Sequence, residues 1–292
     1  MIWRLTILLL ISISTLFSSR FWGAISKDGY SLSSQPIIGQ QHISNQLTEL
    51  REQGSVGDYF DWPYNSGSGW GLLFYNNLLI DTSSHIVRSA LPAFEDPAYV
   101  EFSNAITSNV NEGYLSLGHV RRASSGASNV ISPHPFLFTW NNRTISFAHN
   151  GTLDKDILID LITESGTDFS WIHNNPLETY GCGDWDEPIG WDCVVDSELY
   201  FLWIMKNVVQ MNNLQTGFLN ALSIMEEIDM ADPPLGSQKN CILSDGEIIY
   251  AYRSYDSSDI YYNGTHHEIY FSESNYHYYV MSTPPETSSL DW

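Results

Sequence analysis

Two stretches of the sequence carry polar residues of kinds that bind small charged molecules. The first, "GHVRRASSG" (118–126), places His119 and Arg121 two positions apart. Side chains alternate along a strand, so both would lie on one face if the stretch is extended. An arginine at the end of a strand is well placed to bind a carboxylate through two parallel hydrogen bonds. Taken alone, Arg121 and Arg122 are more commonly surface charges.

The second stretch, "SFAHNGTL" (146–153), contains His149, Asn150 and Gly151 after an apolar run. Asn-Gly pairs commonly form turns, which is the structural interpretation. The functional alternative is an oxyanion hole. The Asn150 amide and a backbone N–H beside the side-chain-free Gly151 can both point at one oxygen that develops negative charge.

Two further stretches have a structural and a functional interpretation, and taken alone the structural one is the more common. "SPHPFLF" (132–138) holds His134 between two prolines, which stiffen its backbone, although a single loop histidine is commonly structural. "DSELYF" (196–201) places Asp196 at the start of a predicted helix. A carboxylate there either caps the helix or binds the ammonium group of a substrate.

The elements that would position these residues are short strands that alternate with a few helices. Hairpins are predicted over 69–83, 136–151 and 241–253, turning at Asn76-Asn77, Asn141-Asn142 and Asp245-Gly246, with further strands after 268. Apolar spacing and helix-start residues predict helices near 97–108 and 153–164, from Asp196 onward, and over 214–228. Helices between two groups of antiparallel strands predict an α+β sandwich.

Composition and charge limit which classes of partner are possible. The 292 residues are 43% hydrophobic and include 34 acidic against 12 basic residues, a formal net charge of −22. Such a surface repels phosphates and anionic lipids, so we expect no nucleic-acid partner and no anionic membrane surface.

The N-terminus is typical of a targeting segment. Arg4 precedes an apolar run from Leu5 to Phe17, which is short for a membrane span, and Ser18 is a small residue suited to cleavage. We expect residues 1–18 to be a signal peptide and the protein to be exported, with no stable membrane span after cleavage. An uncleaved N-terminal membrane anchor is the alternative.

The three cysteines have no metal-ligand spacing. In an exported protein, Cys182 and Cys193 could close a short loop as a disulfide, whereas Cys241 fits a buried free thiol. The loop between the pair is acidic. A solvated loop is favoured over a metal site formed by Asp184, Asp186, Glu187 and Asp192.

Taken together and in this order, the motifs resemble one family, the class II (N-terminal nucleophile) glutamine amidotransferases. They are "SRFWG" from Ser19, "GWGLLFY", "GHVRRASSG", "HPF", "FAHNGTL", "DSELYFL" and "ILSDGEIIYAYR". The similarity is greatest to the stand-alone branch that includes the ergothioneine-pathway γ-glutamyl amidohydrolase. It implies a four-layer αββα sandwich over residues 19–292.

The resemblance also implies catalytic roles. Ser19, exposed as residue one by processing, would be the nucleophile, with its own α-amino group as general base. Attack on a side-chain amide would give an oxyanion held by Asn150 and the N–H of Gly151. Ammonia or an amine would leave, and water would hydrolyse the acyl-enzyme. His149 would be a packing residue rather than a base.

The substrate-binding roles come from the same resemblance. Arg121 would bind the α-carboxylate and Asp196 the α-ammonium of a glutamine or γ-glutamyl group. Ser124 and His134 match positions that shape this pocket, and Arg122 would lie on the opposite strand face as a structural residue. No cofactor is implied, the partner is a small-molecule amide, and nothing indicates the oligomeric state.

Three departures from the family pattern affect the expected activity. Serine replaces the usual cysteine at position 19, and its hydroxyl is less nucleophilic than a thiol; a serine introduced to trap substrate fits equally. "NSGS" (65–68) replaces the His-x-Asp that commonly precedes "GWG". Asn150 lies in a glycosylation sequon, which we expect to be unmodified.

Because no synthase domain follows, hydrolysis is expected rather than amidotransfer. We therefore expect an exported amidohydrolase for glutamine or a γ-glutamyl amide. The alternative is an inactive binding protein that retains the pocket.

Overall fold

The computed structural model describes residues 19–28, 30–33, 37–53, 67–76, 85–108, 113–123, 126, 134–228, 238–254 and 268–282. The predicted signal peptide, Asn65, Ser66 and Ser124 lie outside these residues, as does the predicted strand after Asn77.

The first sheet is antiparallel and has the strand order β3-β2-β4-β1-β10-β9. Its strands are β1 (Arg20–Ser26), β2 (Trp70–Asn76), β3 (Ile86–Ser89), β4 (Gly113–Val120), β9 (Tyr270–Glu273) and β10 (His277–Met281). The central neighbours β1 and β4 pair from Arg20 opposite Val120 to Ile25 opposite Leu115. This register brings the residues before β1 beside those after β4.

The second sheet is also antiparallel, with the order β5-β6-β7-β8. It contains β5 (Phe136–Trp140), β6 (Arg143–Asn150), β7 (Asn240–Ser244) and β8 (Ile249–Tyr252). The two hairpins predicted in this sheet, over 136–151 and 241–253, are confirmed. Asn141 and Asn142 have φ values of 50° and 59°, a left-handed pair that suits the twist of a two-residue turn. Gly246, with φ 87°, turns the other hairpin.

The helices cover the outer faces of the two sheets. Helices α1 (Ile37–Gln53) and α2 (Pro97–Ile106) pack on the first sheet, and α6 (Asp196–Met211) packs on the second, flanked by α3 (Lys155–Thr163) and α7 (Leu214–Glu226). Two short helices, α4 (Ser170–Asn174) and α5 (Pro188–Cys193), follow α3. The predicted helices near 97–108, 153–164, 196 and 214–228 are confirmed, whereas α1 was not predicted.

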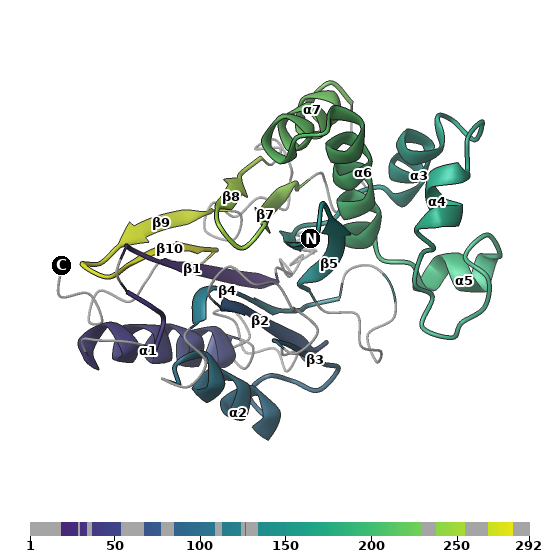
Figure 1. Cartoon of the computed structure of the whole chain (residues 1–292). Helices are drawn as coiled ribbons and strands as arrows, with labels where there is room; N and C mark the ends of the chain where they lie inside the picture. Colours follow the sequence, from purple (N-terminus) through teal and green to yellow (C-terminus); the bar gives the residue numbers. More distant parts are fainter. Residues whose placement is uncertain are drawn as a thin grey trace, which may run out of the picture.

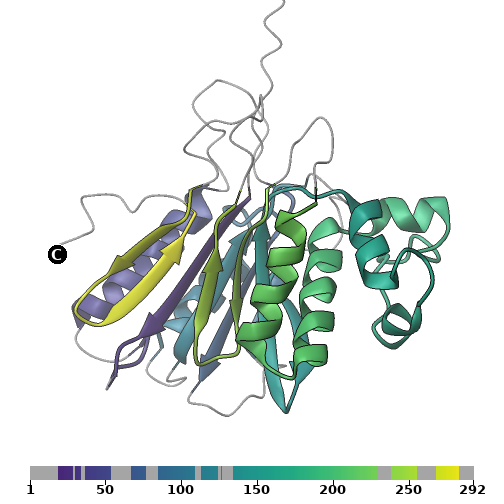
Figure 2. The same cartoon turned by 90° about the horizontal axis from the view of Figure 1, so that it is seen from above.

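The four layers are visible in Figure 1, where α6 and α7 lie above the second sheet and α1 and α2 below the first. Figure 2 shows α6 and α7 side by side. Between the sheets, Phe21, Leu73 and Leu117 of one pack with Ala148 and Ile242 of the other. The predicted αββα sandwich is therefore confirmed.

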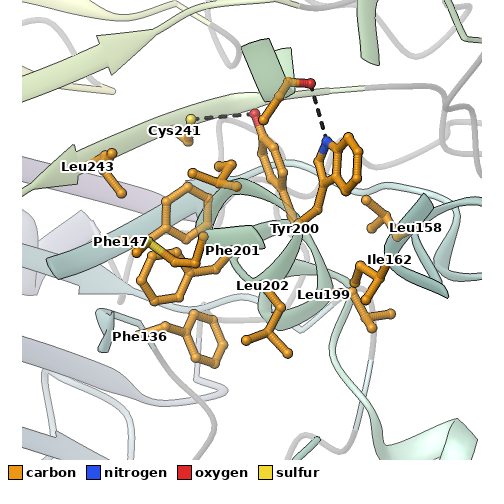
Figure 3. Packing of buried hydrophobic residues seen from close by; sticks show 14 of the residues in the cluster. Phe136, Phe147, Leu158, Ile162, Leu199, Tyr200, Phe201, Leu202, Cys241 and Leu243 are labelled. Atoms are coloured by element: carbon orange, nitrogen blue, oxygen red, sulfur yellow. Dashed lines mark hydrogen bonds between the residues drawn. The ribbon is translucent and has the colours of Figure 1, made fainter. Parts of the chain in front are cut away.

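A larger apolar cluster fills the space between the second sheet and its helices. Phe147 stacks on Phe201 with a ring-centroid distance of 5.0 Å, and Leu199 and Tyr200 are fully buried beside them (Figure 3). Cys241 is buried in this cluster, 3.5 Å from the Tyr200 hydroxyl, which confirms the predicted free thiol. The cluster holds α6 firmly on β6, and both elements contribute residues to the site.

The predicted disulfide between Cys182 and Cys193 is present. The acidic residues of its loop are exposed, and among the described residues no group of three or more His, Cys, Asp or Glu side chains is placed to hold a metal ion. Within the same part of the chain, no helix combines the length and apolar character needed to cross a bilayer.

Candidate active site

Residues from five separate segments surround one small pocket at the ends of the central strands. We call it the Ser19 pocket. It is lined by Ser19, Arg121, Arg122, His134, His149, Gly151, Val195, Asp196 and Ser197. Five of the seven residues predicted for the site, Ser19, Arg121, His134, Gly151 and Asp196, therefore meet here.

Ser19 lies directly before β1, where the pairing of β1 with β4 carries it beside Arg122. Its Oγ accepts a hydrogen bond from the Arg122 N–H at 2.9 Å and lies 3.3 Å from the Arg122 carbonyl, to which the hydroxyl can donate. Strand β4 ends at Val120, so the alternation of side chains does not extend to Arg122. Arg122 borders the pocket, which differs from the expectation that it stands apart on the opposite strand face.

Arg121 and Asp196 place opposite charges inside the pocket wall. Each is only 2% exposed. Burial lowers the pKa of the Arg121 guanidinium, and the nearby negative charge of Asp196 partly counteracts this effect. Because an arginine remains protonated in proteins, the pocket offers one buried cation and one buried carboxylate, a pair that suits a zwitterionic ligand.

Asp196 begins α6 without capping it. The N-cap position is Val195, which makes no side-chain capping bond. The Asp196 Oδ2 instead accepts a hydrogen bond from the Leu153 N–H at 2.9 Å, which ties α6 to the segment after β6. The capping interpretation of Asp196 is therefore wrong. The carboxylate is turned toward the strand that ends in Asn150.

Gly151 and Asn150 stand at the end of β6. A Cβ on Gly151 would lie 2.1 Å from the Gln238 carbonyl oxygen, so this close approach requires glycine. Gly151 lines the pocket, whereas Asn150, 1% exposed, is not among the lining residues. The burial of Asn150 favours an unmodified sequon.

His134 approaches the pocket from the segment before β5. Its Nδ1 lies 3.3 Å from Nδ1 of His119, and the two ring centroids are 4.1 Å apart. The peptide bond between His134 and Pro135 is cis. A Cβ on Gly71 of β2 would lie 2.1 Å from the His134 carbonyl oxygen, so a glycine in "GWGLLFY" lets this segment lie against the first sheet.

His149 is held by two neighbours. Its Nε2 lies 2.8 Å from the Gln238 carbonyl, and its Nδ1 lies 2.8 Å from the Ser197 Oγ. The carbonyl can only accept, so Nε2 carries the proton and Nδ1 accepts from the Ser197 hydroxyl. Burial lowers the pKa of His149, which keeps the ring neutral. These contacts support its predicted packing role.

Ser68, which lies before β2, is hydrogen-bonded to the backbone on either side of Arg122. Ser68 accepts a hydrogen bond from the Ala123 N–H on its Oγ at 3.1 Å, and its own N–H donates to the Arg121 carbonyl. Sequence reasoning noted Ser68 only as a departure from a pattern, and it did not identify Val195 or Ser197. The "DSE" motif was a usable signal for Ser197, whereas nothing in the sequence distinguishes Val195.

The fold and the pocket define the chain as a layered α+β sandwich with a site at the start of a central strand. The sequence matches the family "Glutamine amidotransferases class-II" over residues 40–282. The chain belongs to this family.

Two solved structures resemble this chain to different degrees. A glutamine aminotransferase class-II domain protein from Silicibacter pomeroyi has the same fold, with a TM-score of 0.50, 19% identity, and coverage of 93% of this chain and 89% of that one. A predicted glutamine amidotransferase from Pseudomonas aeruginosa gives a TM-score of 0.33 at 13% identity, covering 93% and 82%.

A curated relative covers less of the chain. An uncharacterised protein of Methanocaldococcus jannaschii is 24% identical over 192 residues, which are 64% of this chain. The match spans 43% of that relative's own length.

Proposed function

We propose that the protein is an amidohydrolase that cleaves glutamine or a γ-glutamyl amide, with Ser19 as its nucleophile. The observation that carries this proposal is the meeting of Ser19, Arg121, Gly151 and Asp196 around one pocket. A buried cation and a buried carboxylate suit the α-carboxylate and α-ammonium of such a substrate.

The proposed reaction uses groups of the protein alone. The Ser19 Oγ forms a bond to the amide carbonyl carbon while its proton passes to the α-amino group of Ser19. The oxyanion is stabilised by the Gly151 N–H and by Asn150 beside it. Collapse breaks the C–N bond, and the departing ammonia or amine takes that proton. Water then hydrolyses the ester and regenerates Ser19.

This mechanism requires a free α-amino group on Ser19, so the proposal includes removal of residues 1–18. Cleavage during export would create the nucleophile and its base in one step. N-terminal sequencing of the protein isolated from its host should then begin at Ser19. A chain that retains residues before Ser19 would contradict the mechanism, because that nitrogen would be tied up in a peptide bond.

Measuring the products released by the processed protein tests the proposed reaction. The processed protein should release ammonia from glutamine or amine from γ-glutamyl amides, and Ser19→Ala should lose at least about a thousandfold in kcat. Ser19→Cys should retain or increase the rate, because a thiol ionises more readily.

Arg121→Lys should mainly raise KM, whereas Arg143→Lys, a matched change on the surface, should leave KM unchanged. Binding without turnover in the processed protein would instead indicate a binding protein.

A further inference from the structure

A chain of hydrogen bonds through three histidines fixes where the protons of the pocket lie. It begins at the His149 carbonyl on β6, which lies 3.2 Å from the Nε2 of His119 on β4. A carbonyl oxygen accepts and never donates. The His119 Nε2 therefore carries a hydrogen.

His119 is neutral, so that hydrogen is its only ring proton. Its side chain is fully buried between the sheets. Burial lowers the pKa of His119 to about 3, and the nearby Arg121 charge acts in the same direction. A neutral imidazole carries one N–H, so the Nδ1 of His119 is bare and can only accept.

The contact between His119 and His134 also determines which ring nitrogen of His134 is protonated. The two Nδ1 atoms lie 3.3 Å apart. Because the His119 Nδ1 must accept, the His134 Nδ1 must donate. Burial also lowers the pKa of His134, with the charges of the neighbouring arginines adding to the effect, so this ring is neutral too. Its Nε2 is then bare.

The bare nitrogen has no protein partner among the described residues. His134 is 3% exposed and lines the Ser19 pocket, yet its buried Nε2 has no hydrogen-bond partner there. An unmatched buried acceptor costs free energy until a donor reaches it. Arg121 and Asp196 line the same pocket.

We propose that His134 is a substrate-binding residue whose Nε2 accepts a hydrogen bond from the α-ammonium group of the bound γ-glutamyl compound, and that His119 is the positioning residue that fixes this tautomer. The identity of the ligand rests on the proposed function. The tautomer does not, because it follows from contacts within the protein.

Nitrogen-15 NMR of the full chain labelled at histidine tests the tautomer directly. The ligand-free protein should show His134 protonated on Nδ1 and His119 on Nε2. A His134 ring protonated on Nε2 overturns the inference whether or not any ligand binds.

L-glutamate is the probe for recognition, added to the processed protein in the same experiment and in calorimetry. Binding should shift the His134 Nε2 resonance in the direction of an accepted hydrogen bond. Binding without that shift overturns the inference. The correct tautomer with no L-glutamate binding contradicts the proposed function and the ligand assigned to His134, while leaving the tautomer network standing.

Two variants of His134 separate the acceptor from the shape of the ring. His134→Phe should weaken L-glutamate binding about ten- to a hundredfold, the range for a lost hydrogen bond to a charged donor. His134→Gln should restore much of the affinity, since its amide oxygen can accept at a similar position. Equal losses in both variants would indicate packing alone and overturn the inference.

His277→Phe is the matched control. His277 is equally buried, and its ring nitrogens contact the Ser31 carbonyl and the Tyr279 hydroxyl, away from the Ser19 pocket. Its removal should leave L-glutamate affinity unchanged. This control shows whether losing a buried histidine lowers affinity through stability alone.

Discussion

Glu198 is a buried carboxyl group that the proposed chemistry does not use. It lies in the first turn of α6, 8% exposed, and accepts a hydrogen bond from the Glu178 N–H at 3.2 Å. Burial raises its pKa to about 8, although the charge of Arg88 acts in the opposite direction. The carboxyl is therefore protonated at neutral pH.

This raised pKa makes stability depend on pH. The folded state holds the proton of Glu198 more tightly than the unfolded chain, so the contribution is complete below about pH 4 and is lost as pH rises toward 8. Glu198→Gln cannot lose a proton. The free energy of unfolding of this variant should equal that of the wild type near pH 4.5. At pH 8.5 it should be higher than that of the wild type by on the order of 1–3 kcal/mol.

Urea unfolding at the two pH values measures this difference. Glu187→Gln, a change at an exposed glutamate, should follow the wild type throughout. If Glu198→Gln shows the same pH dependence as the wild type, Glu198 does not titrate as its burial implies.

At the scale of elements, the loop closed by the disulfide lies directly before the start of α6. Cys193 is three residues before Asp196, and Lys155 of α3 donates hydrogen bonds to the Trp191 and Val194 carbonyls in the same segment, at 2.6 and 3.1 Å. Figure 1 shows α4 and α5 extending to one side of the sandwich, beside α3. The cross-link thus restrains a projecting segment that leads directly into the pocket.

Removal of the cross-link should lower stability. Cys182 and Cys193 are 11 residues apart, and closing a loop of this size contributes about 2–3 kcal/mol by restricting the unfolded chain. The double variant Cys182→Ala/Cys193→Ala should lose about this much in urea unfolding and become insensitive to dithiothreitol. Cys241→Ala should keep its sensitivity to the reductant. A double variant as stable as the wild type would assign no stabilising role to the cross-link.

At the scale of the whole molecule, the net charge of −22 is the dominant electrostatic feature. Like charges repel one another in the compact state more than in the expanded chain, and salt screens this repulsion. The local ion pairs do not offset it. Arg143, for example, contacts both Asp245 and Glu247 at the surface, where such pairs contribute little.

Stability should therefore increase with ionic strength. Calorimetry at pH 7 should show Tm rising by several degrees between 10 mM and 0.5 M sodium chloride, as the screening length falls from about 30 Å to below 5 Å. Sucrose at equal osmolarity provides the uncharged comparison. A Tm that is unchanged or lower in salt would show that self-repulsion is not a significant part of the free energy of folding.

The sequence by itself determined the features that depend on neighbours along the chain. The Asn141-Asn142 turn, the amphipathic spacing of α3 and the cysteine pair are local, and turn conformations and helix periodicity are set by adjacent residues. The ordered motifs also indicated the family and five of the residues that meet in the pocket. In contrast, α1 has a weak apolar pattern and no acidic residue in its first turn, so sequence reasoning did not identify it.

Only the tertiary structure decided how the motifs act on one another. The register of β1 with β4 places Ser19 on the Arg122 peptide group, 103 residues away in the chain. The packing of α6 on β6 turns Asp196 toward Leu153 instead of its own helix. The contact between His119 and His134 settles a tautomer that neither motif specifies. Each depends on strand pairing or burial between distant segments, and local patterns carry no information about such contacts.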